Sequence, residues 1–562
     1  MRCGTMTGVL AVASAPALLC EVPPMDSGRA LLCALAIASL FLLPSVARSA
    51  DWPQWGNTLS RNLVSEETDL PNYWEIGVAG RGDTWVSKPE NLKWAARLGS
   101  QTHGSPVIAG GKVFIGTNNG VPRNPRLTGD RHVLMCFAEA DGKFLWQMAT
   151  PRRARAANFN PDYGNLGLCV APAVDDSRAY VVTSRANVLA MALDALGPGK
   201  APLYAKQASY LAFPVYETVS ASHSGPRVTI KPGSPVAMSP TDGNLAWVYD
   251  MVAGAGSWPH EACSSSVLQV GDLLYVGTGN GRGSDHRTVP SPQGPSLIML
   301  DKQTGKLLAR DNAAIVSGVF HGQWSSPSYG AVKGRPLVFY GGGDGVCYAF
   351  DAQPEKRPDG QPGILRCVWR CDANPPEARR RGYRDPTGPN DIIGTPVFDQ
   401  DRVYVASGQD PRHGPGNGCL TCIDATRTGK LVDGAGVRWR YKGIGRSCST
   451  VSVADGLVYA ADYAGVLHCV EADTGKLVWK QSLGAHVWGS TLCADGKVYV
   501  GNERGQLWVL KAGRQKTVLS TVPMRSPIYT TPAAANGVLY VATHRYLYAL
   551  AKPGPEEAVA SR

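Results

Sequence analysis

A short β pattern that ends in a tight turn recurs eight times along this chain of 562 residues. In the clearest copy, Val466–Trp479, an alternating strand meets the turn Asp473–Lys476, and a second strand then begins. Each copy can be aligned on one small or apolar residue, and these anchor residues are Cys136, Ala192, Met299, Ala349, Cys422, Cys469, Val509 and Ala549. The last three anchors are 40 residues apart. A unit of this size cannot bury its apolar face alone, so neighbouring copies must stack and share a core.

The pattern around each anchor predicts four short antiparallel strands. Strict alternation precedes the anchor, as in Lys497–Gly501 and Val538–Ala542, and such alternation is typical of half-buried strands. After several anchors a Gly-Lys pair closes a tight turn, at Gly142, Gly305, Gly429 and Gly475. The next strand often carries a tryptophan, and these are Trp146, Trp247, Trp369, Trp439 and Trp479. Four strands per unit of about 40 residues indicate an all-β fold, a β-propeller.

The two ends of the repeat region predict how the propeller closes. The last copy, Thr530–Lys552, has three strands and lacks a tryptophan strand, whereas an isolated strand of that type, Asn91–Leu98, precedes the first copy. Pairing these two segments would complete the last blade and remove an exposed sheet edge. We therefore expect an eight-bladed β-propeller of four-stranded antiparallel blades, closed by an N-terminal strand with Trp94 at the tryptophan position.

The segments outside the repeats suggest an exported protein. An apolar run at 30–43 follows Arg29 and precedes the small residues of Ala47-Arg48-Ser49, as in a secretory signal peptide, and the run is too short to span a membrane. We expect a leader at 1–49 with its true start at Met25, an N-terminal extension at 50–90, the propeller at 91–552 with an insertion at 194–243 in its second blade, and a polar tail at 553–562. No lipid-attachment pattern fits. The mature chain is expected to be periplasmic or secreted, monomeric and without a transmembrane span.

The net charge and the positions of the cysteines exclude some partners and some kinds of site. The net charge of +11 is spread along the chain except at Arg379–Arg384, and we expect no binding to nucleic acid. Eleven of the 14 cysteines follow the leader, and several occupy anchor positions, where they should be buried as small apolar residues. Cys419 and Cys422 point to opposite faces of one strand, so we predict neither a shared metal nor a disulfide there.

The repeat resembles a known family. Ala472–Trp479 and its equivalents are similar to the tryptophan-docking repeat of quinoprotein-type propellers. Asp51–Gly56, Gly322–Pro327 and Gly341–Gly345 resemble exported bacterial PQQ-binding-like β-propeller repeat proteins, and the resemblance covers roughly residues 51–552. It implies that each tryptophan docks between blades. The same repeat serves quinone-dependent dehydrogenases and a catalytically silent propeller of the outer-membrane barrel assembly machine, so the family implies a fold and leaves the activity open.

A binding site in a propeller is expected where the first strand of each blade lines the central channel. One residue per blade should face the channel: His103, Cys169, Cys263, Trp324, Ile393, Cys448, Trp488 and Tyr529. Two positions earlier, nearer the mouth, stand Gln101, Gly167, Glu261, Gly322, Asp391, Arg446, His486 and Pro527. Three long loops, 117–132, 279–296 and 408–418, are expected on the same face, and the last two carry Asp285, His286, Asp410 and His413.

Two functions from different classes fit these residues. In the first, the protein is a binding or scaffold protein whose channel mouth holds a protein segment, a glycan or a small ligand. In the second, it is a calcium- and PQQ-dependent dehydrogenase, and the resemblance then implies Glu261 as a calcium ligand, Trp324 or Trp488 as the stacking floor, Asp391 as the base and Arg446 as the quinone clamp, with His486 as a further catalytic candidate. The adjacent Cys-Cys pair of those enzymes is absent from this sequence, and we favour the binding role.

Simple structural roles remain alternatives at every one of these positions. The polar residues of the mouth can equally well solvate a water-filled channel. Among the other histidines, His132 and His544 are expected at the surface or in hairpins, and His468 in the core with its hydrogen bonds satisfied.

Overall fold

The computed structural model describes residues 50–79, 85–153, 164–213, 215–222, 225–231, 233–375, 377–378, 390–411 and 417–553. The chain divides into two compact units, Met1–Arg48 and Ser49–Arg562, and all described residues belong to the second. The predicted signal peptide, the basic segment Arg379–Arg384, His413 and nearly all of the polar tail lie outside the described residues.

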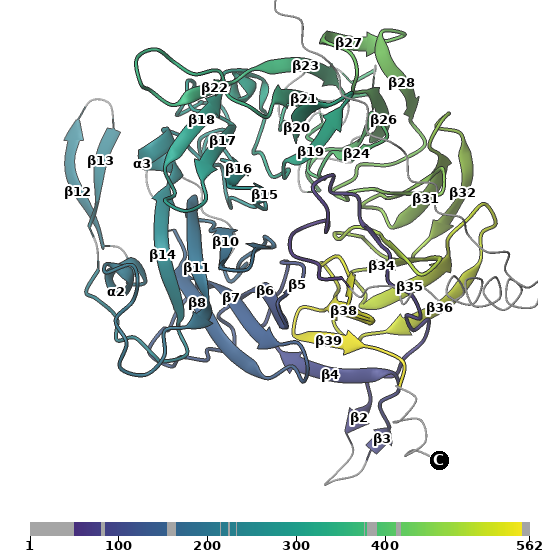
Figure 1. The fold of residues 1–562 in the computed structure, drawn as a ribbon, viewed down its shortest axis with the longest axis horizontal. Coiled ribbons are helices and arrows are strands. Elements are labelled where there is room, and N and C mark those ends of the chain that lie inside the picture. The colour runs from purple at the N-terminus through teal and green to yellow at the C-terminus, as the bar shows by residue number, and fades with distance from the viewer. Residues whose placement is uncertain are drawn as a thin grey trace, which may run out of the picture. The chain divides into compact units, whose positions relative to one another are not determined.

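Most strands of the second unit form four-stranded antiparallel sheet units, each a meander in which the first strand lies innermost (Figure 1). The first four sheet units consist of β5 (Val107–Ala109), β6 (Lys112–Asn118), β7 (Arg131–Ala138) and β8 (Phe144–Pro151); β9 (Ala173–Val174), β10 (Arg178–Val182), β11 (Asn187–Ala195) and β14 (Gly243–Asp250); β15 (Leu268–Val270), β16 (Leu273–Gly277), β17 (Leu297–Asp301) and β18 (Leu307–Asp311); and β19 (Ser328–Val332), β20 (Arg335–Gly341), β21 (Val346–Asp351) and β23 (Cys367–Asp372).

The same arrangement continues to the C-terminal end of the described chain. The following sheet units consist of β24 (Val397–Asp399), β25 (Arg402–Ser407), β26 (Cys419–Asp424) and β28 (Gly436–Tyr441); β29 (Ser452–Ala454), β30 (Leu457–Ala461), β31 (Val466–Glu471) and β32 (Leu477–Ser482); β33 (Leu492–Ala494), β34 (Lys497–Gly501), β35 (Gln506–Lys511) and β36 (Val518–Pro523); and β37 (Ala533–Ala535), β38 (Val538–Ala542), β39 (Tyr546–Leu550) and β4 (Leu92–Arg97).

The remaining elements extend or decorate these sheets. They are β1 (Val64–Ser65) beside β33, β22 (Gly363–Leu365) beside β18, β27 (Gly429–Asp433) between β23 and β28, the pair β2 (Val78–Ala79) and β3 (Trp85–Ser87), the pair β12 (Val215–Ser222) and β13 (Gly225–Lys231), the helices α2 (Gln207–Tyr210) and α3 (Met251–Ala255), and the 3-10 helix η1 (Ile315–Gly318). The pair β12–β13 and α2 belong to the predicted insertion 194–243 and lie beside β14 (Figure 1).

The register of the sheets follows the repeat. Cys136 lies opposite Trp146, Cys469 opposite Trp479 and Ala549 opposite Trp94, and a β-bulge follows each of these pairs. The predicted pairing of the N-terminal strand with the last copy is therefore confirmed by β4 and β39. In the second copy Ala190 pairs with Trp247 and the usual bulge follows, so the predicted anchor Ala192 was wrong by two residues.

Six tryptophans join consecutive sheet units as the resemblance implies. Each indole Nε1 donates to a main-chain oxygen of the following unit at 2.8–3.2 Å, in the pairs Trp94–Glu139, Trp146–Leu193, Trp247–Lys302, Trp369–Ala425, Trp439–Ala472 and Trp479–Gly513. A buried indole N–H needs such an acceptor, so the bond fixes the distance between neighbouring units as well as the ring orientation. The bond of Trp94 runs from the last unit to the first and closes the circuit.

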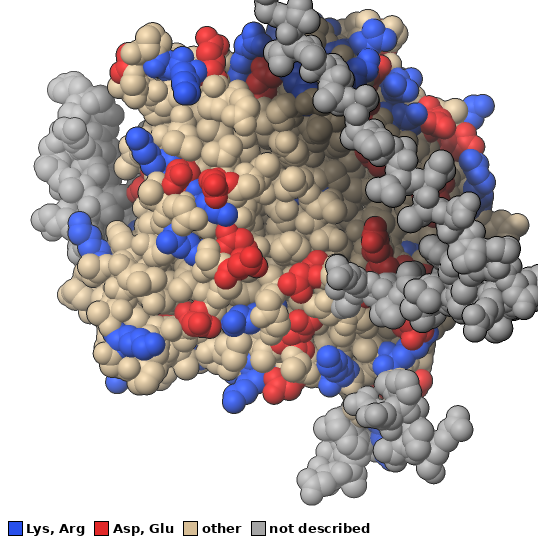
Figure 2. All heavy atoms as spheres, in the orientation of Figure 1, with Lys and Arg blue, Asp and Glu red and all other residues tan. Residues whose placement is uncertain are grey.

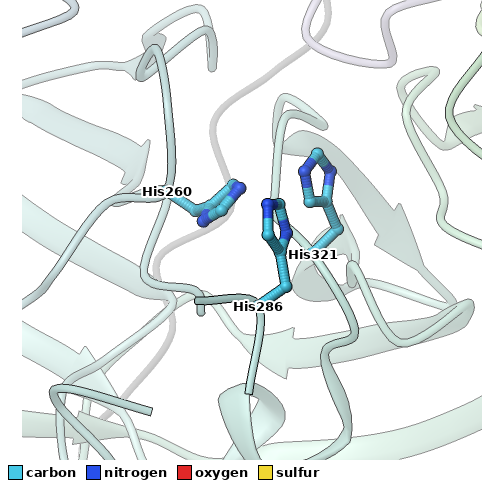
Figure 3. Close-up of side chains that lie close together, drawn as sticks. All are labelled: His260, His286 and His321. Carbon is cyan, nitrogen blue, oxygen red and sulfur yellow. The ribbon is translucent and has the colours of Figure 1, made fainter. Parts of the chain in front are cut away.

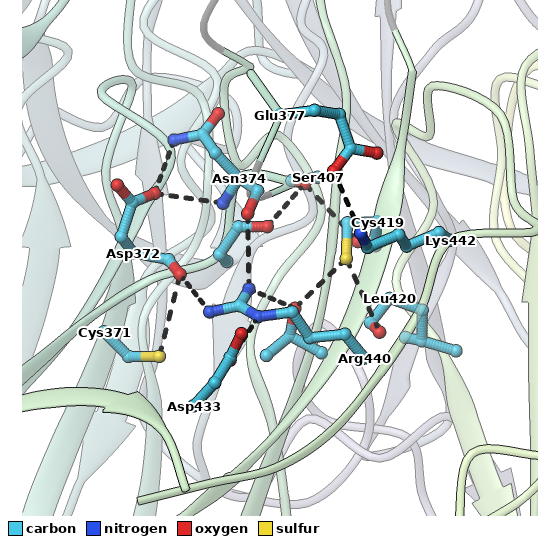
Figure 4. Close-up of polar contacts among 12 residues, drawn as sticks. Cys371, Asp372, Asn374, Glu377, Ser407, Cys419, Leu420, Asp433, Arg440 and Lys442 are labelled. Carbon is cyan, nitrogen blue, oxygen red and sulfur yellow. Dashed lines mark hydrogen bonds and ion pairs between the residues drawn. The ribbon is translucent and has the colours of Figure 1, made fainter. Parts of the chain in front are cut away.

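A polar network also fastens β23 to the next sheet unit (Figure 4). The Arg440 guanidinium donates to the main-chain oxygen of Asp372 at 2.8 Å and forms an ion pair with Asp433 at 2.7 Å. Ser407 donates to the main-chain oxygen of Ala373 at 3.0 Å. Parallel pairing of β27 with β23 continues the sheet across this junction.

The segment 51–67 crosses the centre of the circuit (Figure 1). It makes hydrogen bonds to residues of the innermost strand of every sheet unit, and these residues are Ile108, Val174, Gln269, Tyr329, Phe398, Val453, Cys493 and Ala534. Its Arg61 is fully buried and donates to the main-chain oxygens of Trp55, Pro327 and Val267. The N-terminal extension therefore closes one end of the channel.

The distribution of charged side chains and the burial of the cysteines can be compared with the expectations from the sequence. Basic and acidic side chains are intermingled over the face in Figure 2. Cys136, Cys422 and Cys469 are fully buried at their anchor positions, as predicted. Within the described ranges, no helix has the length and apolar character needed to span a bilayer.

Candidate functional site

A cavity of about 650 Å³ occupies the channel above the N-terminal segment. Seven of the eight residues predicted to face the channel line it: His103, Cys169, Trp324, Ile393, Cys448, Trp488 and Tyr529. The eighth, Cys263, is buried with its thiol 3.2 Å from the main-chain oxygen of Thr278. Trp55 of the crossing segment also lines the cavity and donates to Thr395 Oγ1 at 3.0 Å, so this segment contributes to the cavity wall.

Aromatic side chains form one side of this cavity. The rings of Trp488 and Tyr529 are stacked with centroids 5.4 Å apart and an angle of 26° between their planes. His103 meets the edge of Tyr529 at 5.1 Å, and its Nε2 lies 2.9 Å from the side-chain amide of Gln101. These side chains come from the segments that lead into the innermost strands, so the flat faces are held by a rigid sheet framework.

Carboxylates supply the charge of the cavity. Glu261, Asp410 and Glu503 line it, and among its described lining residues there is no lysine or arginine. Glu503 accepts a hydrogen bond from the Tyr529 hydroxyl at 2.7 Å and contacts His486 Nδ1 at 3.0 Å. Burial and then the Glu503 carboxylate raise the pKa of Tyr529 above its ordinary value, so the phenol keeps its proton and donates. The cavity therefore presents acceptors and flat apolar faces together.

The candidate residues from the sequence divide into two groups. Glu261, Trp324 and Trp488 line the cavity together. Asp391, Arg446 and His486 are not among its lining residues.

Each residue of the second group has a different environment. Asp391 is buried, its main chain pairs with Gly408, and burial followed by the charge of Asp410 raises the pKa of its carboxyl well above the ordinary value. The Arg446 guanidinium stacks over Tyr463 at 4.7 Å. His486 is half exposed and stacks on the ring of Tyr463, with centroids 4.4 Å apart. Of the residues two positions before the channel-facing ones, Gln101 and Glu261 line the cavity, whereas these three do not.

Sequence reasoning missed Glu503, which lies in the short turn between β34 and β35. The connections between the second and third strands were expected on the mouth face, but only the three long loops among them were searched for site residues. It also missed His260 and His321, which lie with His286 beside Glu261. The sequence does contain an indication of this group, because His260 and His321 directly precede the mouth positions Glu261 and Gly322 of neighbouring repeats.

Comparison with known proteins relates the repeats to a family. The family model described as outer membrane protein assembly factor BamB matches residues 374–481 and 417–545. The proteins of that name from Salmonella typhimurium and Escherichia coli are 34% identical over 91 residues and 36% identical over 80 residues, which are 14% and 12% of this chain. Residues 374–545 of the chain thus carry PQQ-like repeats. The matches of this PQQ-like repeat protein span only 23% and 20% of the length of those curated relatives.

Solved structures resemble the PQQ-like repeat protein loosely. BamB from Moraxella catarrhalis has a TM-score of 0.45 with 15% identity over 81% of this chain and 96% of its own. Quinohemoprotein alcohol dehydrogenase from Comamonas testosteroni has a TM-score of 0.43 with 15% identity over 94% of this chain and 85% of its own. The fold assignment of the PQQ-like repeat protein therefore rests on the strand pairing and the repeats.

Proposed function

We propose that this protein is a binding protein whose channel cavity holds a small neutral sugar. The observation that carries the proposal is the stacked pair Trp488–Tyr529 with Glu503 hydrogen-bonded to it, inside a cavity of about 650 Å³. Ligand sites of this size combine apolar aromatic walls with a few polar groups that fix orientation. The C–H faces of a sugar ring pack on aromatic rings, and its hydroxyl groups donate to carboxylates.

The charge of the cavity favours a ligand without negative charge. Its described lining holds three carboxylates, Glu261, Asp410 and Glu503, and an anionic ligand would meet repulsion in a partly desolvated site. Hydroxyl donors meet no such cost, and each hydrogen bond to a charged acceptor contributes more than one between neutral groups.

The same lining does not fit the quinone of the alternative function. PQQ carries three carboxylates and needs cationic partners, whereas the described lining supplies carboxylates of its own. Arg446, the candidate clamp, stacks on Tyr463 outside the lining. Asp391, the candidate base, is buried beneath the mouth with a raised pKa, which opposes its action as a base at neutral pH. We therefore derive no quinone-dependent step.

The proposed setting is an exported eight-bladed propeller, with the domain boundaries that the sequence predicts. The pairing of β4 with β39 and the contacts of segment 51–67 with every innermost strand support one closed circuit of blades. The apolar run 30–43 supports export to the periplasm or beyond, and we expect a monomer. The matched relatives are named for outer membrane protein assembly, so a protein segment at the mouth is the competing occupant.

Calorimetric titration of the purified protein with a panel of neutral mono- and oligosaccharides tests the proposal. At least one sugar should bind, and Trp488→Ala should weaken its binding by at least about fivefold, since a stacking ring contributes roughly 1–3 kcal/mol. Tyr546→Ala is the matched control, because Tyr546 is a half-exposed aromatic residue on β39 outside the cavity lining. Calcium-dependent binding of PQQ with dye-linked turnover would replace the proposal with the enzyme function. Absence of binding by every sugar would overturn it in favour of a protein partner.

A further inference from the structure

Three histidines from three separate segments meet beside the cavity (Figure 3). His260 lies in the segment that leads to β15, His286 in the loop between β16 and β17, and His321 in the segment between η1 and β19. The nitrogen atoms that each could offer to a metal lie within 4.8 Å of one another. Their ring centroids are 4.3–5.0 Å apart.

Main-chain hydrogen bonds hold these segments together. His260 N donates to Gly279 O at 3.1 Å, and Arg282 N donates to His321 O at 3.1 Å. The stretch 279–282 thus lies between the backbones that carry His260 and His321, and the same loop carries His286. The cluster is built into the junction of two sheet units rather than assembled by mobile side chains.

The His260 ring is oriented for coordination. Its Nδ1 donates to the main-chain oxygen of Arg282 at 2.8 Å, which leaves Nε2 with the lone pair. That Nε2 is buried and has no hydrogen-bond partner within the described structure. Metal-bound histidines commonly donate their other ring N–H to a carbonyl in this way.

A carboxylate completes the set of ligands. Glu261 Oε1 lies 3.9 Å from His321 Nε2, and Glu261 also lines the cavity. Its backbone has a φ of +56°, a left-handed conformation that non-glycine residues rarely adopt and that is found at functional sites. This conformation follows His260 directly, so consecutive residues of one segment both serve the cluster.

We propose that His260, His286 and His321 bind a divalent transition metal ion, with zinc as the reference, and that Glu261 provides a fourth ligand from the cavity wall. Three imidazoles with a carboxylate suit Zn²⁺, whereas Ca²⁺ and Mg²⁺ prefer oxygen ligands throughout. On tetrahedral zinc, with Zn–N distances of about 2.05 Å, ligand nitrogens lie about 3.3 Å apart. Small rotations of the imidazoles therefore bring the cluster to coordination distance.

The metal site goes beyond the proposed sugar binding and would serve it in two ways. The ion would tie the loop 279–296 to two sheet units, and it would hold the Glu261 carboxylate in place in the cavity wall. Zinc binding is measured without sugar, so failure of one proposal leaves the other standing.

Metal content and competition titration test the site on the purified full chain. After removal of metals with a chelator, Zn²⁺ is titrated against a chromophoric competitor, and one ion per chain is expected. His286→Gln should weaken binding by at least about 100-fold, because even changes in the outer shell of zinc sites cost about 10- to 100-fold. Glu261→Gln should weaken binding less than His286→Gln, since the imidazoles remain.

Two controls keep the result decisive. His486→Gln alters a half-exposed histidine outside the cluster and should leave zinc affinity unchanged. His286→Gln and the wild type should unfold at the same temperature without metal, and zinc should raise the midpoint of the wild type alone. Co²⁺ bound to the wild type should show the intense visible absorption of a four-coordinate ion. Zinc uptake below one ion per chain, or equal affinity in the wild type and His286→Gln, would overturn the proposal.

Discussion

The indole Nε1 of Trp94 lies 2.8 Å from the main-chain oxygen of Glu139, and this bond joins the last sheet unit to the first. Trp94 also lies opposite Ala549 in the ladder of β4 and β39. A residue near the start of the described chain therefore completes the last repeat and docks on the first. Closure of this kind leaves few exposed sheet edges, which suits a rigid platform for a central cavity.

Trp94→Ala should lower the free energy of unfolding by about 3–5 kcal/mol, the range for truncating a buried aromatic side chain. The indole is only 7% exposed, and its removal leaves the Glu139 oxygen without this donor. Urea unfolding followed by circular dichroism measures the change. Tyr546→Ala, at an exposed position on the same ladder, should cost less than about 1 kcal/mol.

Deletion of residues 91–98 is the stronger form of this prediction. It removes the partner of β39, so the open edge should cause aggregation during gel filtration. A monomeric deletion variant with wild-type stability would show that the seam does not close the fold.

The docking of tryptophan on glycine predicts unequal effects at two Gly-Lys pairs. Gly475 has a φ of +69°, and a Cβ built there would lie 2.5 Å from Trp439 Cε3. Gly429 was expected to close a similar turn, but it begins β27 and pairs with Trp369; its φ is +82°, and a Cβ there meets no heavy atom within 4 Å. Gly429→Ala should therefore cost only the backbone strain of about 1 kcal/mol.

Gly475→Ala should cost about 1–3 kcal/mol more than Gly429→Ala, because the indole must move out of a packed interface. The midpoint of urea unfolding for the two variants gives the comparison. Equal losses would mean that the Trp439 ring shifts freely and that the contact does not stabilise the junction.

Strand register was predictable because it depends on local alternation and on one conserved geometry. Opposite several anchors, such as Cys469, stands the tryptophan of the next strand, and a bulge follows in the same place. In the second copy the same pair and bulge are formed by Ala190 and Trp247, two residues before the predicted anchor Ala192. Alternation puts every second residue of a strand on the same face, so it does not distinguish Ala190 from Ala192.

Site residues could be predicted from the sequence only where they occupy equivalent positions in successive repeats. Residues such as Trp324 and Trp488 line the cavity because each precedes an innermost strand at an equivalent position. The histidine cluster depends instead on the pairing of the stretch 279–282 with two other segments, a tertiary contact without a periodic signal. The crossing of segment 51–67 likewise follows from bonds to residues far along the chain, which no local pattern of that segment indicates.

Arg61→Met should destabilise the protein by about 3–5 kcal/mol, comparable to breaking a buried ion pair. The guanidinium is fully buried, and its loss leaves three main-chain oxygens, those of Trp55, Pro327 and Val267, without a donor. Arg357→Met, at an exposed ion pair with Asp359, should cost less than about 1 kcal/mol. Thermal and urea unfolding of both variants measure the difference, and similar small losses would show that the crossing segment contributes little to stability.

His132 predicts an acid-sensitive component of stability. The sequence suggested a surface or hairpin residue. His132 lies in the β6–β7 hairpin, but it is not at the surface: the residue is 1% exposed, and its ring is hydrogen-bonded to Ser184. Burial, followed by the charges of Arg152 and Arg185, lowers the pKa of His132 from 6.5 to about 3. Between these two values the unfolded chain binds a proton that the folded chain excludes, so stability falls as the pH falls below 6.5.

The His132→Asn variant lacks this proton linkage. At about pH 5 the histidine should cost the wild type about 2 kcal/mol relative to about pH 7.5, so the stability difference between wild type and variant should shrink by that amount. Urea unfolding at the two pH values measures it. Thr150→Val removes a buried, non-ionisable donor to the main-chain oxygen of His132, at 3.2 Å, and its cost should not change with pH. A pH-independent difference between wild type and His132→Asn would mean that the folded protein accepts the proton at this site, through a local opening that exposes the ring.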